Sequence, residues 1–229
     1  MPEGFPTRQV NQVRFVAVTS TGVSASSWAY ADALVGEDEI LQAARARAEE
    51  VGVVPIGAGG GATLRFLASV LEAKNVVEIG TGTGVSGLWL LRGMRSDGVL
   101  TTVDIETEHQ RLARQTFNEA GFPQPRARCI AGAALDVLPR LTDGHYDLVF
   151  VDGEKTEYAA YFTEALRLLR PGGVMAFDNA LWHDRVADPS QRDEATTVVR
   201  ELTRTVADHE SLVPVLLPVG DGLLLARKL

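Results

Sequence analysis

The chain has 229 residues, of which 45% are hydrophobic and 23% charged, and its formal net charge is −8. Nucleic-acid binding depends on Lys and Arg that neutralise phosphates, so this acidic balance argues against a nucleic-acid partner. The single cysteine, Cys129, excludes an intrachain disulfide and a cysteine-based metal site. We expect a cytoplasmic protein with one main domain and an N-terminal extension.

The N-terminal part carries only a weak imitation of a targeting signal. In the run from Arg14 to Ser26, Thr and Ser interrupt the apolar middle, and no apolar stretch approaches the roughly 18 residues of a membrane span. We therefore expect no membrane partner, and we expect residues 1–12 to be the least ordered part of the chain.

The first strong helical pattern covers Glu37 to Val51, where apolar residues recur at helical spacing and acidic residues occupy the first turn. The sequence GAGGG at Gly57 to Gly61 is predicted to break the helical pattern. A second helix is then expected from Ala62 to Glu72.

Strands and helices alternate over the next hundred residues. Strands are predicted at Asn75–Ile79, Val99–Ile105, Ala127–Ile130, Tyr146–Val151 and Gly173–Phe177. Helices are predicted at Ser86–Met94, Thr107–Ala120, Leu135–Leu141 and Tyr158–Leu169. This alternation indicates an α/β, doubly wound, Rossmann-like and mainly parallel sheet with helices on both faces.

The C-terminal part departs from this alternation. A polar helix is expected from Arg192 to Ala207, and two apolar runs, Leu212–Val219 and Leu223–Lys228, flank Gly220-Asp221-Gly222. Because Asp-Gly between apolar runs is a strong hairpin signal, the sheet is predicted to close with a C-terminal antiparallel hairpin strand.

The glycine-rich stretch VEIGTGTGVSG follows the first strand of the alternation and contains G-x-G-x-x-G at Gly82, Gly84 and Gly87. Glycines at a strand-to-helix turn let backbone N–H groups approach a phosphate, a carboxylate or an adenosine group. They indicate a nucleotide-like ligand. They do not select a dinucleotide, because the first glycine after the strand is Gly80, and counted from there the third glycine position falls on Val85.

Two acidic residues accompany this loop. Glu78 has no role in the dinucleotide pattern, and its charge inside an apolar strand requires a cation or hydrogen-bond donors. Asp104, at the end of the second strand of the alternation, suits the two hydroxyls of a ribose, although capping of the helix that follows is an alternative.

A second polar group ends two later strands, in FVDGEK (Phe150 to Lys155) and FDN (Phe177 to Asn179). Asp152, Asp178 and Asn179 supply the oxygen ligands that Mg²⁺, Mn²⁺ or Ca²⁺ prefer, so they are predicted to hold a divalent metal, Mg²⁺ first. Lys155 is either a general base and charge partner near this metal or a solvated cation at a helix start. His109, His145 and His209 are expected to face solvent.

Together these motifs resemble the class I S-adenosylmethionine-dependent, divalent-metal-dependent O-methyltransferases of the catechol and caffeoyl-CoA type, including their bacterial members. The similarity runs from about Pro55 to the C-terminus. Its most specific parts are VEIGTGTGVSGLWL, GAALDVLP, YDLVFVDGEKTEY and FDNALW. It implies a methyltransferase domain over residues 55–229 and an N-terminal extension, residues 1–54, that forms a cap and part of the acceptor pocket.

The resemblance implies a cofactor site for S-adenosylmethionine, with Glu78 facing its ammonium group, Asp104 its ribose and Ala134 its adenine. The residues assigned to this site are Ile56, Glu78, Gly80, Thr81, Gly82, Ser86, Asp104, Ile105, Ala134, Asp152 and Glu154, of which Glu154 replaces the second Asp of the family's DxDK pattern.

The same resemblance assigns the metal to Asp152, Asp178 and Asn179, and makes Lys155 and Asp152 catalytic. The acceptor is expected to contact Lys155, Asn179, Trp182 and His183. Trp28, Tyr30 and Trp182 are expected either to wall a flat pocket or to belong to the core. The predicted reaction moves a methyl group to a hydroxyl of a small, catechol-like or phenolic acceptor, and the family resemblance implies a homodimer.

Two other functions remain open at this level. An NAD(P)-dependent oxidoreductase would share the fold, but the Tyr-x-x-x-Lys pattern of short-chain dehydrogenases is absent from the sequence. A non-catalytic module that binds S-adenosylmethionine is the second alternative, and the intact set of Asp152, Asp178, Asn179 and Lys155 argues against it.

Overall fold

The computed structural model describes residues 23–229. The expectations for residues 1–12 and for most of the signal-like run lie outside the described residues. The strands are β1 Asn75–Ile79, β2 Val99–Asp104, β3 Ala127–Ala131, β4 Tyr146–Val151, β5 Leu169–Phe177, β6 Leu212–Leu217 and β7 Leu223–Lys228. The helices are α1 Ala25–Asp32, α2 Glu39–Glu50, α3 Ala58–Val70, α4 Val85–Gly93, α5 Thr107–Glu119, α6 Ala134–Val137, α7 Tyr158–Leu168 and α8 Glu194–Asp208, with 3₁₀ turns at Leu138–Arg140 and Lys155–Glu157.

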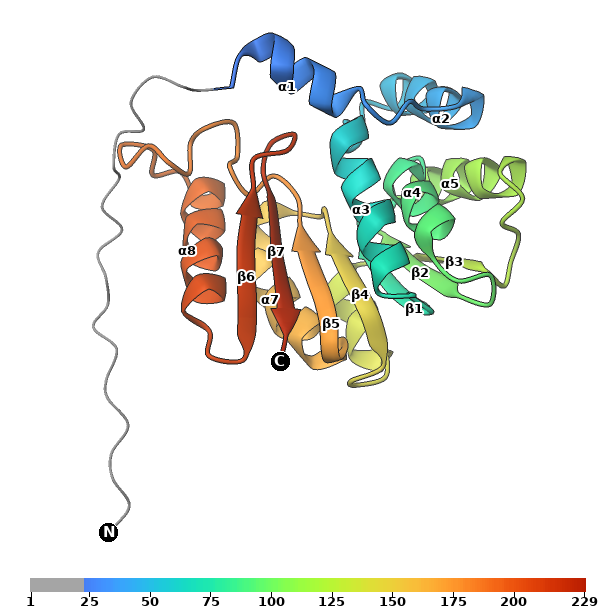
Figure 1. Ribbon diagram of the computed structural model, residues 1–229. Helices are drawn as coiled ribbons and strands as arrows, with labels where there is room; N and C mark the ends of the chain where they lie inside the picture. The colour runs from blue at the N-terminus through green and yellow to red at the C-terminus, as the bar shows by residue number, and fades with distance from the viewer. Residues whose placement is uncertain (1–22) are drawn as a thin grey trace.

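The strands form one seven-stranded sheet in the order β3-β2-β1-β4-β5-β7-β6 (Figure 1). Strands β1 to β5 are parallel, and β7 runs antiparallel to both β5 and β6. The predicted doubly wound sheet with a closing hairpin is therefore confirmed. The order reverses between β1 and β4, which is the switch point where open α/β sheets bind ligands.

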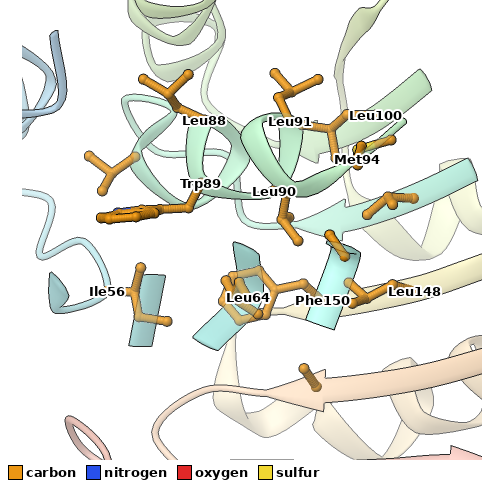
Figure 2. Packing of buried hydrophobic residues seen from close by; sticks show 14 of the residues in the cluster. Ile56, Leu64, Leu88, Trp89, Leu90, Leu91, Met94, Leu100, Leu148 and Phe150 are labelled. Atoms are coloured by element: carbon orange, nitrogen blue, oxygen red, sulfur yellow. The ribbon is translucent and has the colours of Figure 1, made fainter. Parts of the chain in front are cut away.

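Helices cover both faces of the sheet, and the sheet separates the core into two layers. Helices α2 to α5 pack on one face, where Leu64 of α3 and Leu90 of α4 share a cluster with Phe150 of β4 (Figure 2). Helices α7 and α8 pack on the other face, against Val149 and Val151 of the same strand. Successive strand residues thus enter opposite layers, as the period of a strand requires.

The GAGGG sequence does not break the helical pattern, which corrects that prediction. Helix α3 begins at Ala58 and contains all three following glycines. A Cβ atom at Gly61 would lie 2.3 Å from the indole of Trp89 on α4, and one at Gly60 would lie 2.6 Å from Ile56. Close packing of α3 against α4 and its neighbours therefore requires glycine here, and it outweighs the helix propensity cost of about 1 kcal/mol per glycine.

Two further boundaries differ from the sequence-based expectation. Helix α1 was not predicted, and it buries no residue. Strand β5 begins at Leu169, where the preceding helix was expected to end. The division between residues 54 and 55 stays a prediction, and α2, on its N-terminal side, buries Leu41, Ala44 and Ala48 in the same core as α3 and α4.

Among the described residues, no helix combines the length and apolar character needed to cross a membrane.

Candidate functional site

The register of the parallel strands brings the predicted polar residues to one edge of the sheet. The register aligns Ile79, Val151 and Phe177, which end β1, β4 and β5. Val103 of β2 pairs with Ile79 and so lies at the same level. The residues that follow these four are Gly80, Asp104, Asp152 and Asp178. The predicted convergence of strand ends is therefore confirmed.

A cavity of about 530 Å³ opens at this edge, next to the switch point. Its lining includes every residue predicted to contact the cofactor except Glu78, namely Ile56, Gly80, Thr81, Gly82, Ser86, Asp104, Ile105, Ala134, Asp152 and Glu154. The individual contacts that these residues make to a cofactor stay predictions. The cavity places them within one space, as a common ligand requires.

The glycines of the loop after β1 have different structural causes. Gly80 has φ +90°, and a Cβ atom there would lie 2.1 Å from the carbonyl oxygen of Asp152, so only glycine fits between β1 and β4. Gly87 lies inside α4, where a Cβ atom would lie 2.8 Å from the ring of Phe117. The third glycine of the literal G-x-G-x-x-G therefore allows α4 to pack against α5.

Asp104 holds the glycine loop in place. Its Oδ2 accepts hydrogen bonds from the backbone N–H groups of Thr81 at 3.0 Å and Gly82 at 2.9 Å, and its Oδ1 accepts one from Glu106 N at 2.9 Å. His109, which was expected to face solvent, lies 3.3 Å from this carboxylate and lines the cavity. That expectation was wrong because the start of α5 borders the cavity, where both Glu106 and His109 belong to the lining.

Glu78 is fully buried behind the cavity, and hydrogen-bond donors satisfy its carboxylate. Ser86 Oγ donates to Oε1, and Thr102 Oγ1 donates to Oε2, both at 2.6 Å. The hydrogen-bond network continues from Thr102. Its Oγ1 pairs with Thr81 Oγ1 at 2.6 Å, and Gln110 Nε2 donates to Thr81 Oγ1. Sequence reasoning missed Thr102 and Gln110, although Gln110 stands out as a polar residue on the apolar face of α5.

Burial raises the pKa of Glu78 from 4.5 to about 7, against the effect of the hydrogen bonds from Ser86 and Thr102, and the charges of Asp152 and Asp104 raise it further. The folded protein therefore binds this proton more tightly than the unfolded chain does. The resulting stabilisation is present in full below about pH 4.5 and is lost as the pH rises through 7.

We expect Glu78→Gln to remove this dependence in the cofactor-free protein. The free energy of unfolding of Glu78→Gln relative to the unmodified chain should rise by about 3 kcal/mol between acidic and mildly alkaline pH. Urea unfolding at both pH values measures this difference, and subtracting the two proteins cancels the other titrating groups. A difference that did not change with pH would contradict the raised pKa.

The cavity is strongly acidic. The carboxylates in its lining come from Asp104, Glu106, Asp152, Glu154 and Glu157, and the described lining contains no Lys or Arg. A dinucleotide would bring its pyrophosphate into this negative field, which favours a cationic ligand instead. S-adenosylmethionine, with a sulfonium and an ammonium group, matches the charge of the cavity.

Asp152 and Asp178, two of the predicted metal ligands, follow the aligned ends of β4 and β5, and Asn179 follows Asp178. Asp178 is 5% exposed, and burial, followed by the charge of Asp152, raises its pKa to about 7. Its Oδ1 accepts a hydrogen bond from Asn179 N at 2.8 Å. Among the described residues, the second carboxylate oxygens of Asp152 and Asp178 and the side-chain amide of Asn179 make no hydrogen bond. Their oxygen atoms are therefore available as ligands.

Lys155 lies beside this acidic pair. Its Nζ donates to Asp152 Oδ1 at 2.9 Å, to Gly153 O at 3.1 Å and to the Tyr158 hydroxyl at 2.8 Å. Lys155 is 8% exposed, which excludes the alternative of a solvated cation. Tyr158 is fully buried and donates in turn to the carbonyl oxygen of Asp178 at 3.0 Å, which joins the ends of β4 and β5. The sequence signal for Tyr158 is its position one helical turn after Lys155, and it was overlooked.

The residues predicted to contact the acceptor are only partly brought together. The ring of Trp182 lies 5.8 Å from Lys155 Nζ and 5.1 Å from the ring of His183. Trp28 lines a separate cavity between α1, α3 and the β6–β7 turn, and Tyr30 is 74% exposed. Trp28 therefore lines a cavity, but one whose lining does not include Trp182, and the expectation was wrong for Tyr30, which is exposed because α1 lies on the outside of α3.

Comparison with known proteins gives the family. The model of the O-methyltransferase family matches residues 33–229. A Mycobacterium tuberculosis (strain H37Rv) protein named "Probable O-methyltransferase" is 50% identical over 201 residues, which cover 88% of this chain and 90% of that protein.

Solved structures agree with this match. The O-methyltransferase TomG from Streptomyces achromogenes, in complex with S-adenosylmethionine, is 33% identical with a TM-score of 0.80, over 87% of this chain and 94% of that chain. An O-methyltransferase from Bacillus cereus, in complex with S-adenosylhomocysteine, is 27% identical with a TM-score of 0.81, over 90% and 98%. The chain therefore belongs to the O-methyltransferase family and is an S-adenosylmethionine-dependent methyltransferase.

Proposed function

We propose that this enzyme methylates one hydroxyl of a small catechol-like acceptor and that a divalent metal, Mg²⁺ first, assists the reaction. The observation that carries the proposal is the position of Asp152. This residue lines the acidic cofactor cavity and also belongs to the carboxylate pair at the ends of β4 and β5. The methyl donor and an acceptor bound at that pair would therefore meet at one residue.

The residues present fit a metal. Asp152, Asp178 and Asn179 offer three oxygen donors, and the mutual repulsion of the two carboxylates is relieved by a cation. Asp152 and Asp178 would hold the ion together with Asn179. A bound divalent ion lowers the pKa of a hydroxyl near it and orients the oxygen.

The chain's own residues account for the remaining steps. In the reaction the acceptor oxygen forms a bond to the methyl carbon as the carbon–sulfur bond breaks, and S-adenosylhomocysteine leaves. Lys155 is held by Asp152, Gly153 and Tyr158. As an ammonium group it balances the negative charge of the acceptor oxygen, and it takes the hydroxyl proton only in its neutral form, after it has released a proton to solvent. The face of Trp182, next to Lys155, would stack against an aromatic acceptor.

A paired assay tests the acceptor class. We expect methyl transfer from S-adenosylmethionine to pyrocatechol to exceed transfer to phenol by at least about 100-fold in kcat/KM. The reason is that phenol lacks the second hydroxyl with which pyrocatechol would bind at the ends of β4 and β5. Mass spectrometry of the methylated product measures both rates. Equal rates with the two acceptors would contradict the proposal, and tight binding of NADH in place of S-adenosylhomocysteine would favour the oxidoreductase. A cytoplasmic location and a homodimer belong to the proposal as well and stay predictions.

A further inference from the structure

The loop that follows β5 has an unusual backbone. Asn179, Trp182, His183 and Asp184 have φ angles of 56°, 48°, 54° and 63°, so three consecutive residues with side chains occupy the left-handed region. Residues other than glycine adopt this conformation rarely, and it persists only where the surrounding structure holds it. Something outside the loop must therefore fix it.

The turn between β6 and β7 makes the contacts that hold this loop. Ala180 N donates to Gly222 O, and Leu181 N donates to Asp221 O, both at 2.9 Å. His183 N donates to Asp221 Oδ1 at 2.7 Å. Asp221 and Gly222 of this turn, which the sequence marked only as a hairpin signal, thus accept three hydrogen bonds from the loop.

Gly222 brings the two segments into direct contact. Its φ is +87°, and a Cβ atom at this position would lie 2.5 Å from Leu181 Cγ and 2.8 Å from Leu181 N. Gly220, in the same turn, also has a positive φ of +56°, yet a Cβ atom there would meet nothing within 4 Å. The close approach is therefore specific to Gly222.

Asp221 also faces the side chain of His183. Its Oδ2 is buried without a hydrogen-bond partner among the described residues and lies 3.6 Å from His183 Nδ1. An unpaired buried carboxylate oxygen is unfavourable, and a hairpin turn by itself does not require it. A small rotation of the imidazole would complete this hydrogen bond. Oδ1 of Asp221 thus holds the His183 backbone, and Oδ2 lies next to the His183 side chain.

We propose that Asp221 and Gly222 form a clamp that positions Trp182 and His183 for the acceptor. Asp221 is a positioning residue, because it acts on the acceptor through the loop. The inference rests on the proposed function at one point, which is that an aromatic, hydroxylated acceptor binds next to Lys155 and Trp182. The clamp sets how tightly such an acceptor is held and leaves the cofactor cavity unchanged, since neither Asp221 nor Gly222 lines that cavity.

Four variants test the clamp. Asp221→Ala removes the side-chain acceptor of His183 N, and Gly222→Ala disrupts the close approach to Leu181. Asp221→Asn keeps an oxygen for His183 N, and Gly220→Ala is the matched control in the same turn. Amide hydrogen exchange of the peptide that covers residues 179–187 reports on the loop without any need for an acceptor. Calorimetry with S-adenosylhomocysteine and methyl transfer to pyrocatechol complete the set.

We expect the His183 amide to exchange about tenfold faster in Asp221→Ala, because it loses its side-chain acceptor. We expect the Leu181 amide to exchange about tenfold faster in Gly222→Ala, because the added methyl group would push Leu181 away from the turn. The KM for pyrocatechol should rise by about tenfold, with kcat changed by less than about threefold. Affinity for S-adenosylhomocysteine should stay within about twofold in all variants. Gly220→Ala introduces a side chain at a positive φ without a clash, so it should lower stability but leave the exchange of these amides and the KM as in the unmodified protein. Asp221→Asn should retain most of the protection.

Unchanged exchange in both Asp221→Ala and Gly222→Ala would overturn the clamp. So would faster exchange with an unaltered KM, because the loop would then not position the acceptor. If the unmodified protein transferred no methyl group to pyrocatechol, the proposed function would fail, while the exchange data would still decide whether the clamp holds the loop.

Discussion

Asp178→Ala is expected to lower methyl transfer to pyrocatechol by at least about 100-fold in kcat/KM. Replacing even an outer partner of a metal site costs about 10- to 100-fold in activity or metal affinity, and a direct ligand should cost no less. Asp178 does not line the cofactor cavity, so affinity for S-adenosylhomocysteine should be retained. EDTA should abolish transfer by the unmodified enzyme, and added Mg²⁺ should restore it.

Stability separates this loss from misfolding. Burial and the charge of Asp152 raise the pKa of Asp178, so the ionised carboxylate is unfavourable in the metal-free fold. Asp178→Asn keeps the shape of the side chain and an oxygen for Asn179 N, and its midpoint of thermal unfolding should equal or exceed that of the unmodified protein near neutral pH. Asp208→Ala, at the exposed end of α8, is the matched control. Undiminished transfer in EDTA would show that the metal assignment is wrong.

Lys155→Ala is expected to lower kcat by about 10²- to 10⁴-fold, the range that a positioned acid or base contributes, whether Lys155 takes the proton in its neutral form or balances charge as an ammonium group. Three acceptors surround the compact ammonium group of Lys155, a geometry that the planar guanidinium of Arg does not match. We therefore expect Lys155→Arg to lose activity as well. Tyr158→Phe removes one of the three acceptors and should cost about tenfold, which corresponds to one hydrogen bond.

The readout for Lys155 is kcat at saturating S-adenosylmethionine, together with binding of S-adenosylhomocysteine, which should persist because Lys155 lies outside the cofactor cavity. Lys74→Ala is the control, since Lys74 is exposed and pairs with Asp97 on the surface. If Lys155→Arg retained most of the activity, the role of Lys155 would be to balance charge, with the proton going elsewhere.

Much of the fold was predictable because its signals are local. The apolar runs of β1, β2 and β4, the helical spacing of α2 and the Asp-Gly turn before β7 each act over a few residues. The GAGGG segment was not predictable in this way. Its place inside α3 depends on Trp89, which lies on a different helix, and helix propensity carries no information about such a neighbour.

For the site, the sequence by itself determined which residues end the parallel strands. Since such strands share one edge, Gly80, Asp104, Asp152 and Asp178 had to meet there. What only the tertiary structure decided is which side chains from other elements reach that edge. Tyr158 fixes Lys155, Thr102 donates to Glu78, and Asp221 holds the loop at His183. These contacts join residues that sheet register and helix packing bring close together. The local pattern of residues determines neither the register nor the packing.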